Sequence, residues 1–102
     1  MAVITVETRA IKETAHTLLG WCFDPRFQGA VDAFRTKHLR LEYGEFVPFV
    51  VAGGVAPLAY PDITKSRCKF VINQLKLARE KFPRLKRVIL FAHGNTCAYY
   101  CT

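Results

Sequence analysis

The chain has 102 residues, of which 51% are hydrophobic, and it carries a formal net charge of +7. This length corresponds to one small domain, and its eight Phe residues favour a packed core over intrinsic disorder. No apolar run reaches the roughly 18 residues that a membrane-spanning helix needs. The first residues also lack the basic start and long apolar stretch of a signal peptide, so we expect a cytoplasmic protein without a membrane segment.

Three apolar runs predict three strands, at residues 14–22, 45–51 and 87–92. The last run is continuously apolar, which is typical of a strand that is covered on both faces of its sheet. Helical segments are expected between these strands, and alternation of this kind favours an α/β fold with a mostly parallel sheet. Residues 1–13 fit no element firmly, and we expect an arm or an edge strand there.

Two helices are predicted from apolar residues that recur at three- and four-residue spacing, over residues 26–39 and 68–82. Pro25 suits the first turn of the first helix, and Pro83 ends the second. The pair Gly53-Gly54 follows the middle strand and predicts a turn with positive φ or a close backbone approach.

The basic residues are spread along the chain and are densest at residues 35–40 and 79–87. Each of these stretches is typical of the polar face of a helix that runs into a loop. A basic domain can also bind nucleic acid, but no clustered aromatic–basic motif occurs, and we expect no nucleic-acid partner.

Residues suited to binding or catalysis stand at the end of each predicted strand. Cys22 ends the first strand, Gly53-Gly54 follow the second and His93 follows the third. Ligands of open parallel sheets bind outside the carboxyl ends of the strands, so one shared site is expected there. Cys22, His93 and Cys97 would provide three ligands for Zn²⁺ and leave the fourth position open for water, as catalytic zinc requires. Zinc lowers the pKa of its bound water to about 7, which gives a hydroxide nucleophile at neutral pH.

Asp24 and Arg26 follow Cys22 at two-residue spacing, which can turn both side chains the same way. An Arg fork can hold a carboxylate through two parallel hydrogen bonds, and Asp24 would then stay ionised and orient the zinc-bound water. Two simpler interpretations stay open, namely a buried core thiol at Cys22 and a plain turn at Asp24-Pro25. Cys101, four residues after Cys97, is an alternative third ligand.

These residues resemble the β-class carbonic anhydrases, with Cys22-x-Asp24-x-Arg26 after one strand and His93 close to Cys97 after a later one. The resemblance extends over residues 18–100. It implies a three-layer β-carbonic anhydrase-like domain, Zn²⁺ bound by Cys22, His93 and Cys97, and catalytic assistance from Asp24 and Arg26. It further implies attack of zinc hydroxide on CO₂ to give bicarbonate, in a homodimer.

The chain departs from that family in its second motif and in its length. Three residues separate His93 from Cys97, where the family has two, and family members continue with more helix and a further strand. We therefore expect a small or truncated member whose single domain spans residues 1–102. The alternatives are a non-catalytic zinc domain, in which Asp24 closes the fourth position, and a hydrolase of another small neutral substrate.

Overall fold

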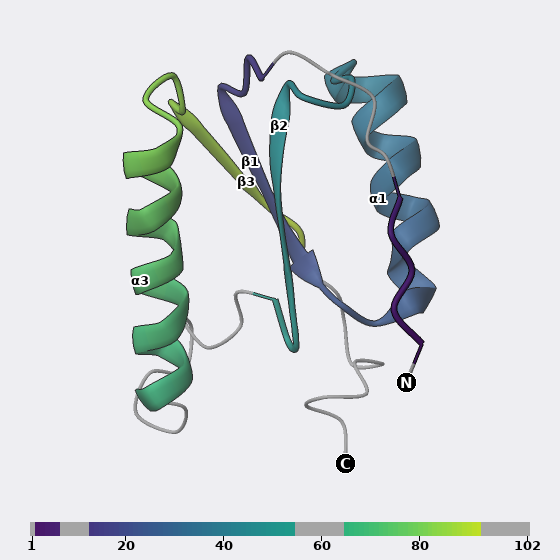
Figure 1. Cartoon of the computed structure of the whole chain (residues 1–102). Coiled ribbons are helices and arrows are strands. Elements are labelled where there is room, and N and C mark those ends of the chain that lie inside the picture. The colour runs from purple at the N-terminus through teal and green to yellow at the C-terminus, as the bar shows by residue number, and fades with distance from the viewer. Residues whose placement is uncertain (1, 7–12, 55–64, 93–102) are drawn as a thin grey trace.

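The computed structural model describes residues 2–6, 13–54 and 65–92, which form a three-stranded parallel sheet with helices on both faces. The strands are β1 (Thr17–Cys22), β2 (Phe46–Val51) and β3 (Arg87–Leu90), in the order β2-β1-β3. Figure 1 shows α1 on one side of this sheet and α3 on the other. The general α/β architecture and the parallel strands predicted from the sequence are confirmed.

The central strand β1 is the most deeply buried element, because it pairs with a strand on each side and carries a helix over each face. All six of its residues are buried. It begins three residues later than the sequence predicts, and the backbone before it bonds to the segment that leads into β2, from Thr14 N to Gly44 O and from His16 N to Glu45 O. Side chains alternate across a strand, so neighbouring residues of β1 serve opposite faces of the sheet.

The helical segment predicted over residues 26–39 is one continuous run with three geometries: the 3₁₀ turn η1 (Pro25–Phe27), the α-helix α1 (Gln28–Phe34) and the π-helical turn η2 (Arg35–Leu39). Asp24 caps its start, since its side chain accepts a hydrogen bond from the Arg26 backbone N–H. The run ends at Arg40, whose left-handed backbone (φ 52°) closes the last turn.

The core between α1 and the sheet is built around Leu19 and Trp21 of β1 and Val31 of α1, with Leu41 closing one side. Edge-to-face aromatic contacts extend it, because Phe91 meets both Trp21 and Phe34 at ring-centroid distances of 6.5 and 5.5 Å.

The second helix, α3 (Lys65–Lys81), covers the other face of the sheet. Val71 is its buried residue, and Leu18 of β1 is buried on the same side, where it lines a groove together with Ile72 and Leu75 of α3. The Phe82 N–H still bonds to the Ala78 carbonyl, and the helix stops before Pro83 as predicted.

The third strand is less buried than its sequence predicts, and that prediction is wrong. Val88 and Leu90 are 50% and 41% exposed, and Ile89 is the residue of β3 that packs on the α1-side core. The physical reason is the width of the sheet: β3 lies at its edge and pairs only with β1 among the described strands. A continuous apolar run therefore marks a strand here without marking burial on both faces.

Arg35 is a buried cation in a stretch that the sequence assigns to a polar helix face. Its guanidinium lies over the rings of Tyr43 and Phe46, at 4.9 and 5.1 Å from their centroids, and donates from Nη1 to the Leu41 carbonyl at 2.6 Å. Asp32 approaches Nη2 at 3.8 Å. These contacts hold the π-helical turn against the start of β2.

The N-terminal residues 2–6 adopt neither helix nor strand, and their side chains are exposed. Within the described part of the chain, no helix has both the length and the apolar character needed to cross a lipid bilayer.

Candidate functional site

The carboxyl ends of the three strands meet at one edge of the sheet, as the sequence predicts. Cys22, the last residue of β1, stands opposite Val51, the last residue of β2. On the other side the Phe91 N–H donates to the Gly20 carbonyl at 2.8 Å, so the chain continues alongside β1 past the end of β3. Ala92 then lines the same cavity as Cys22.

The glycine turn after β2 lies directly against the backbone of Cys22. Gly53 and Gly54 both have positive φ, of 73° and 56°, which confirms the predicted turn. A Cβ atom on Gly54 would lie 2.9 Å from the Cys22 nitrogen and 3.1 Å from the Trp21 carbonyl carbon. Only glycine therefore allows this turn to close on the end of β1.

Asp24 and Arg26 form the bidentate pair expected from their spacing. Arg26 Nη2 donates to Asp24 Oδ2 at 2.7 Å, and Arg26 Nε donates to Oδ1 and Oδ2 at 3.0 and 3.2 Å. The Arg26 backbone N–H adds a bond of 3.0 Å to Oδ1. Four donor contacts from one residue favour the ionised carboxylate and fix its orientation.

The two members of this pair differ in exposure. The Asp24 side chain is 6% exposed and the Arg26 side chain 58% exposed. The 3₁₀ turn causes the difference, because it tucks Asp24 beneath the helix that it caps and leaves Arg26 on the outside. The site thus has a buried acceptor and a cation that solutes can approach.

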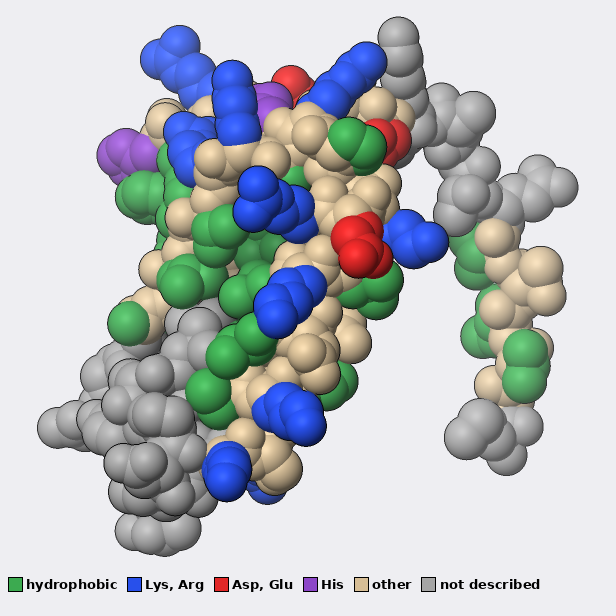
Figure 2. Space-filling view, turned by 90° about the vertical axis from the view of Figure 1, so that its left-hand side faces the viewer, with side chains coloured by type: hydrophobic (Ala, Val, Ile, Leu, Met, Phe, Trp, Pro, Cys, Tyr) green, Lys and Arg blue, Asp and Glu red, His purple; other side chains and the backbone are tan. Residues whose placement is uncertain are grey.

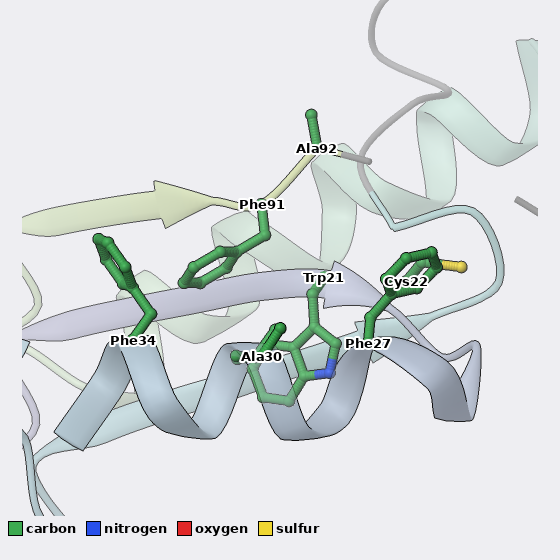
Figure 3. A pocket seen from close by; sticks show the side chains of 8 residues that line it. Trp21, Cys22, Phe27, Ala30, Phe34, Phe91 and Ala92 are labelled. Carbon is green, nitrogen blue, oxygen red and sulfur yellow. The ribbon is translucent and has the colours of Figure 1, made fainter. Parts of the chain in front are cut away.

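Cys22 is almost fully buried, at 1% exposure, and lines a cavity of about 200 Å³ between α1 and the sheet. Figure 3 shows the residues that line it: Phe27, Ala30 and Phe34 from the helical run, Trp21 and Cys22 from the end of β1, and Phe91 and Ala92 from the segment after β3. The Cys22 sulfur points away from the rings of Trp21, Phe34 and Phe91. Apart from the indole N–H, the side chains that face this cavity are apolar, because alternation along β1 turns the Cys22 thiol to the opposite face from Trp21. A cavity this small and apolar suits a small neutral molecule.

Of the five predicted site residues, the structure brings Cys22, Asp24 and Arg26 to one strand end. His93 and Cys97 lie outside the described residues, as does the alternative ligand Cys101. Among the residues described, no group of three His, Cys, Asp or Glu side chains could hold a metal ion. The predicted zinc site therefore stays a prediction.

The described histidines lie away from this strand end. The His16 ring is hydrogen-bonded to Thr17 Oγ1 at the opposite end of β1, and the His38 ring packs on Phe34 at 5.0 Å. Cys68, predicted to be a core residue, is partly buried on α3.

The aromatic wall of the cavity was missed by reasoning from the sequence. Trp21, Phe34 and Phe91 supply most of it. Their signal was present, because each stands on the apolar face of a predicted element, but an apolar face indicates a core and does not show where that core is hollow.

Comparisons with protein-family models, with curated proteins and with solved structures found no match for this chain.

Proposed function

We propose that this chain is a zinc-dependent lyase with a β-carbonic anhydrase-like fold, which hydrates CO₂ to bicarbonate at the carboxyl end of its sheet. The observation that carries the proposal is the bidentate Asp24–Arg26 pair, formed two residues past the buried Cys22 and at the same strand end as a small apolar cavity. A thiol, an oriented carboxylate and an apolar chamber are the parts that such a reaction uses.

In this proposal Cys22, His93 and Cys97 hold the metal, with Cys101 as the alternative to Cys97. The donor set fits Zn²⁺, which prefers thiolate and imidazole ligands. Chain connectivity supports it, because Ala92 lines the cavity with Cys22 and immediately precedes His93 in the sequence. Bound zinc would supply Lewis acidity, which makes water nucleophilic at neutral pH.

Asp24 would orient the attacking water by accepting one of its hydrogen bonds, while Arg26 keeps the carboxylate ionised and aligned. Both carboxylate oxygens already accept hydrogen bonds from Arg26. This pairing competes with ligation of a metal ion by Asp24. It therefore favours the catalytic form of the site over the non-catalytic zinc domain, in which Asp24 closes the fourth position.

The cavity suits the substrate. CO₂ is small, neutral and apolar, and a chamber of about 200 Å³ walled by aromatic rings would concentrate it at the carboxyl end of β1. The exposed cation of Arg26 would then attract bicarbonate as an anion near the mouth of the site.

A homodimer belongs to the proposal as well. Val3, Ile4 and Val6 in the N-terminal segment are all more than 70% exposed. Exposed aliphatic side chains in succession are unfavourable in water, and burial against a second copy of the chain would remove them from it.

The test is zinc content together with stopped-flow CO₂ hydration on the purified protein, for the unmodified chain, Cys22→Ser and the matched control Cys68→Ser. We expect about one zinc per chain and catalysed hydration in the unmodified protein and the control, and loss of both in Cys22→Ser. Circular dichroism checks that each variant keeps its fold.

Two outcomes would overturn the proposal. A metal-free unmodified protein without hydration activity would remove the zinc site. Stoichiometric zinc with hydration at the uncatalysed rate would instead identify a non-catalytic zinc domain.

A further inference from the structure

The positive charge of this protein is concentrated in one region. Residues 65–87 contain nine basic residues and one acidic residue, Glu80, which gives a net +8. The rest of the chain contains six basic and seven acidic residues, a net −1. Figure 2 shows the side of the molecule on which α3 lies, where Lys and Arg side chains project with hydrophobic side chains between them. The excess charge is therefore a property of α3 and of the segment that leads into β3.

A groove of about 620 Å³ lies within this region, between α3 and the sheet. Its apolar lining comes from Leu18 of β1, Ile72 and Leu75 of α3, Leu85 of the connecting turn and Val88 of β3. Its cationic side chains are Lys76, Arg79 and Lys86. Arg87 also borders the groove, but it shares the α1-side face of the sheet with Leu19 and Ile89. None of the described residues that line the groove is acidic, so no carboxylate among them neutralises the three cations.

The cations come from two directions and are held by the fold. Lys76 and Arg79 are three residues apart on α3, which puts them on the same face of the helix. Lys86 is held beside the start of β1, because its backbone N–H donates at 3.0 Å to the carbonyl of His16, the residue before that strand. The Arg87 side chain is turned to the opposite face, where its Nε donates to Thr17 Oγ1 at 3.1 Å. The cations that line the groove are therefore partly preorganised for a ligand.

We propose that this groove binds an amphiphilic anion, with an aliphatic chain on the apolar lining and a phosphate or carboxylate head group on the three cations Lys76, Arg79 and Lys86. The volume lies in the range of small-molecule sites. Lys and Arg can line such a chain with their own aliphatic stems while their charged ends meet the head group. Among the described residues that line the groove none is aromatic, which argues against stacking of nucleic-acid bases on them.

This site is independent of the proposed zinc chemistry. Leu18, Arg87 and Val88 belong to the amino-terminal halves of β1 and β3, whereas Cys22 ends β1 at the opposite edge of the sheet.

The experiment is isothermal titration calorimetry with decyl phosphate, kept below the concentration at which it forms micelles. We expect one site per chain, with affinity falling about fourfold for each methylene removed from the chain. Inorganic phosphate and the nonionic decyl maltoside test the head group and the chain separately, and each should bind at least roughly tenfold more weakly.

Two double variants with the same change of charge test the location. Lys76→Gln with Arg79→Gln removes two groove cations, and we expect the affinity for decyl phosphate to fall at least about tenfold. Lys65→Gln with Lys69→Gln removes two cations of α3 that do not line the groove, and less than about a twofold change is expected. Gln has nearly the helix propensity of Lys and Arg, so both variants should keep α3, as circular dichroism would check.

Equal weakening in the two double variants would show a diffuse electrostatic effect and would overturn the site. The same conclusion would follow if inorganic phosphate bound as tightly as decyl phosphate. It would also follow if decyl phosphate did not bind, including the case in which a duplex oligonucleotide bound in its place.

Discussion

The two faces of the sheet at the central strand differ in how tightly they are packed and in the charge around them. Under α1, the side chains of Leu19 and Trp21 close a core, and the cavity that remains is small and walled by aromatic rings. Under α3, the sheet is less covered, and a larger groove carries a rim of three cations. The net charge of +7 therefore comes from residues 65–87, since the rest of the chain has a net charge of −1.

This difference separates two kinds of ligand. The candidate site at the end of β1 has one ion pair and an apolar chamber, which suits a neutral substrate such as CO₂. The groove under α3 has the field that attracts anions. The positive charge of the groove therefore lies at the amino-terminal edge of the sheet, away from the candidate site at the carboxyl edge.

The largest stability effects are expected from truncation of the two neighbouring leucines of β1, which serve opposite faces. Leu19→Ala should destabilise the protein by about 4–5 kcal/mol, because it opens a cavity in the tight α1-side core. Leu18→Ala should cost only about 2–3 kcal/mol, because Leu18 already borders the α3-side groove. Urea unfolding of both variants measures the difference. Equal costs, or a larger cost for Leu18→Ala, would contradict the unequal packing of the two faces.

Next in size is a pair of Gly→Ala changes that differ in the space around them. Gly54→Ala should destabilise by about 2 kcal/mol or more, because Ala is strained at φ 56° and its Cβ would press on the end of β1. Gly29→Ala in α1 meets nothing within 4 Å and should stabilise by up to about 1 kcal/mol.

The two Ala variants are compared by thermal unfolding. A tolerated Gly54→Ala would mean that the glycine turn does not close on Cys22, and the geometry of the candidate site would have to be revised.

The smallest effect on folding is expected at Arg26, whose side chain is mostly exposed. Arg26→Lys keeps the charge but loses the bidentate geometry, so stability should change by less than about 0.5 kcal/mol. Under the proposed function, CO₂ hydration should nevertheless fall about tenfold, because Asp24 loses its alignment. Arg84→Lys, at an exposed position outside the site, is the matched control. Unchanged hydration in Arg26→Lys would leave the pair with a capping role only.

Much of the fold was readable from the sequence, because local patterns determine it. The three apolar runs, the two helical stripes and Pro83 locate the elements to within a few residues. The pairing of Asp24 with Arg26 was also predictable, since it depends on a two-residue spacing at a turn.

Features that depend on distant residues were harder to predict. The edge position of β3 depends on how many strands the sheet has, which no single run reveals. The burial of Arg35 depends on Tyr43 and Phe46, which follow a turn, although its four-residue spacing from the buried Val31 was a weak signal. The groove under α3 depends on cations from two elements that meet only in the fold.

The central claim is that the carboxyl end of the sheet binds zinc through Cys22 and the segment after Ala92. X-ray absorption spectroscopy at the zinc edge of the purified protein tests it most directly. The account predicts two sulfur ligands, one imidazole nitrogen and one light oxygen ligand, with sulfur at about 2.3 Å and nitrogen at about 2.0–2.1 Å from the metal. A protein that binds no zinc, or a zinc shell without sulfur, would contradict it.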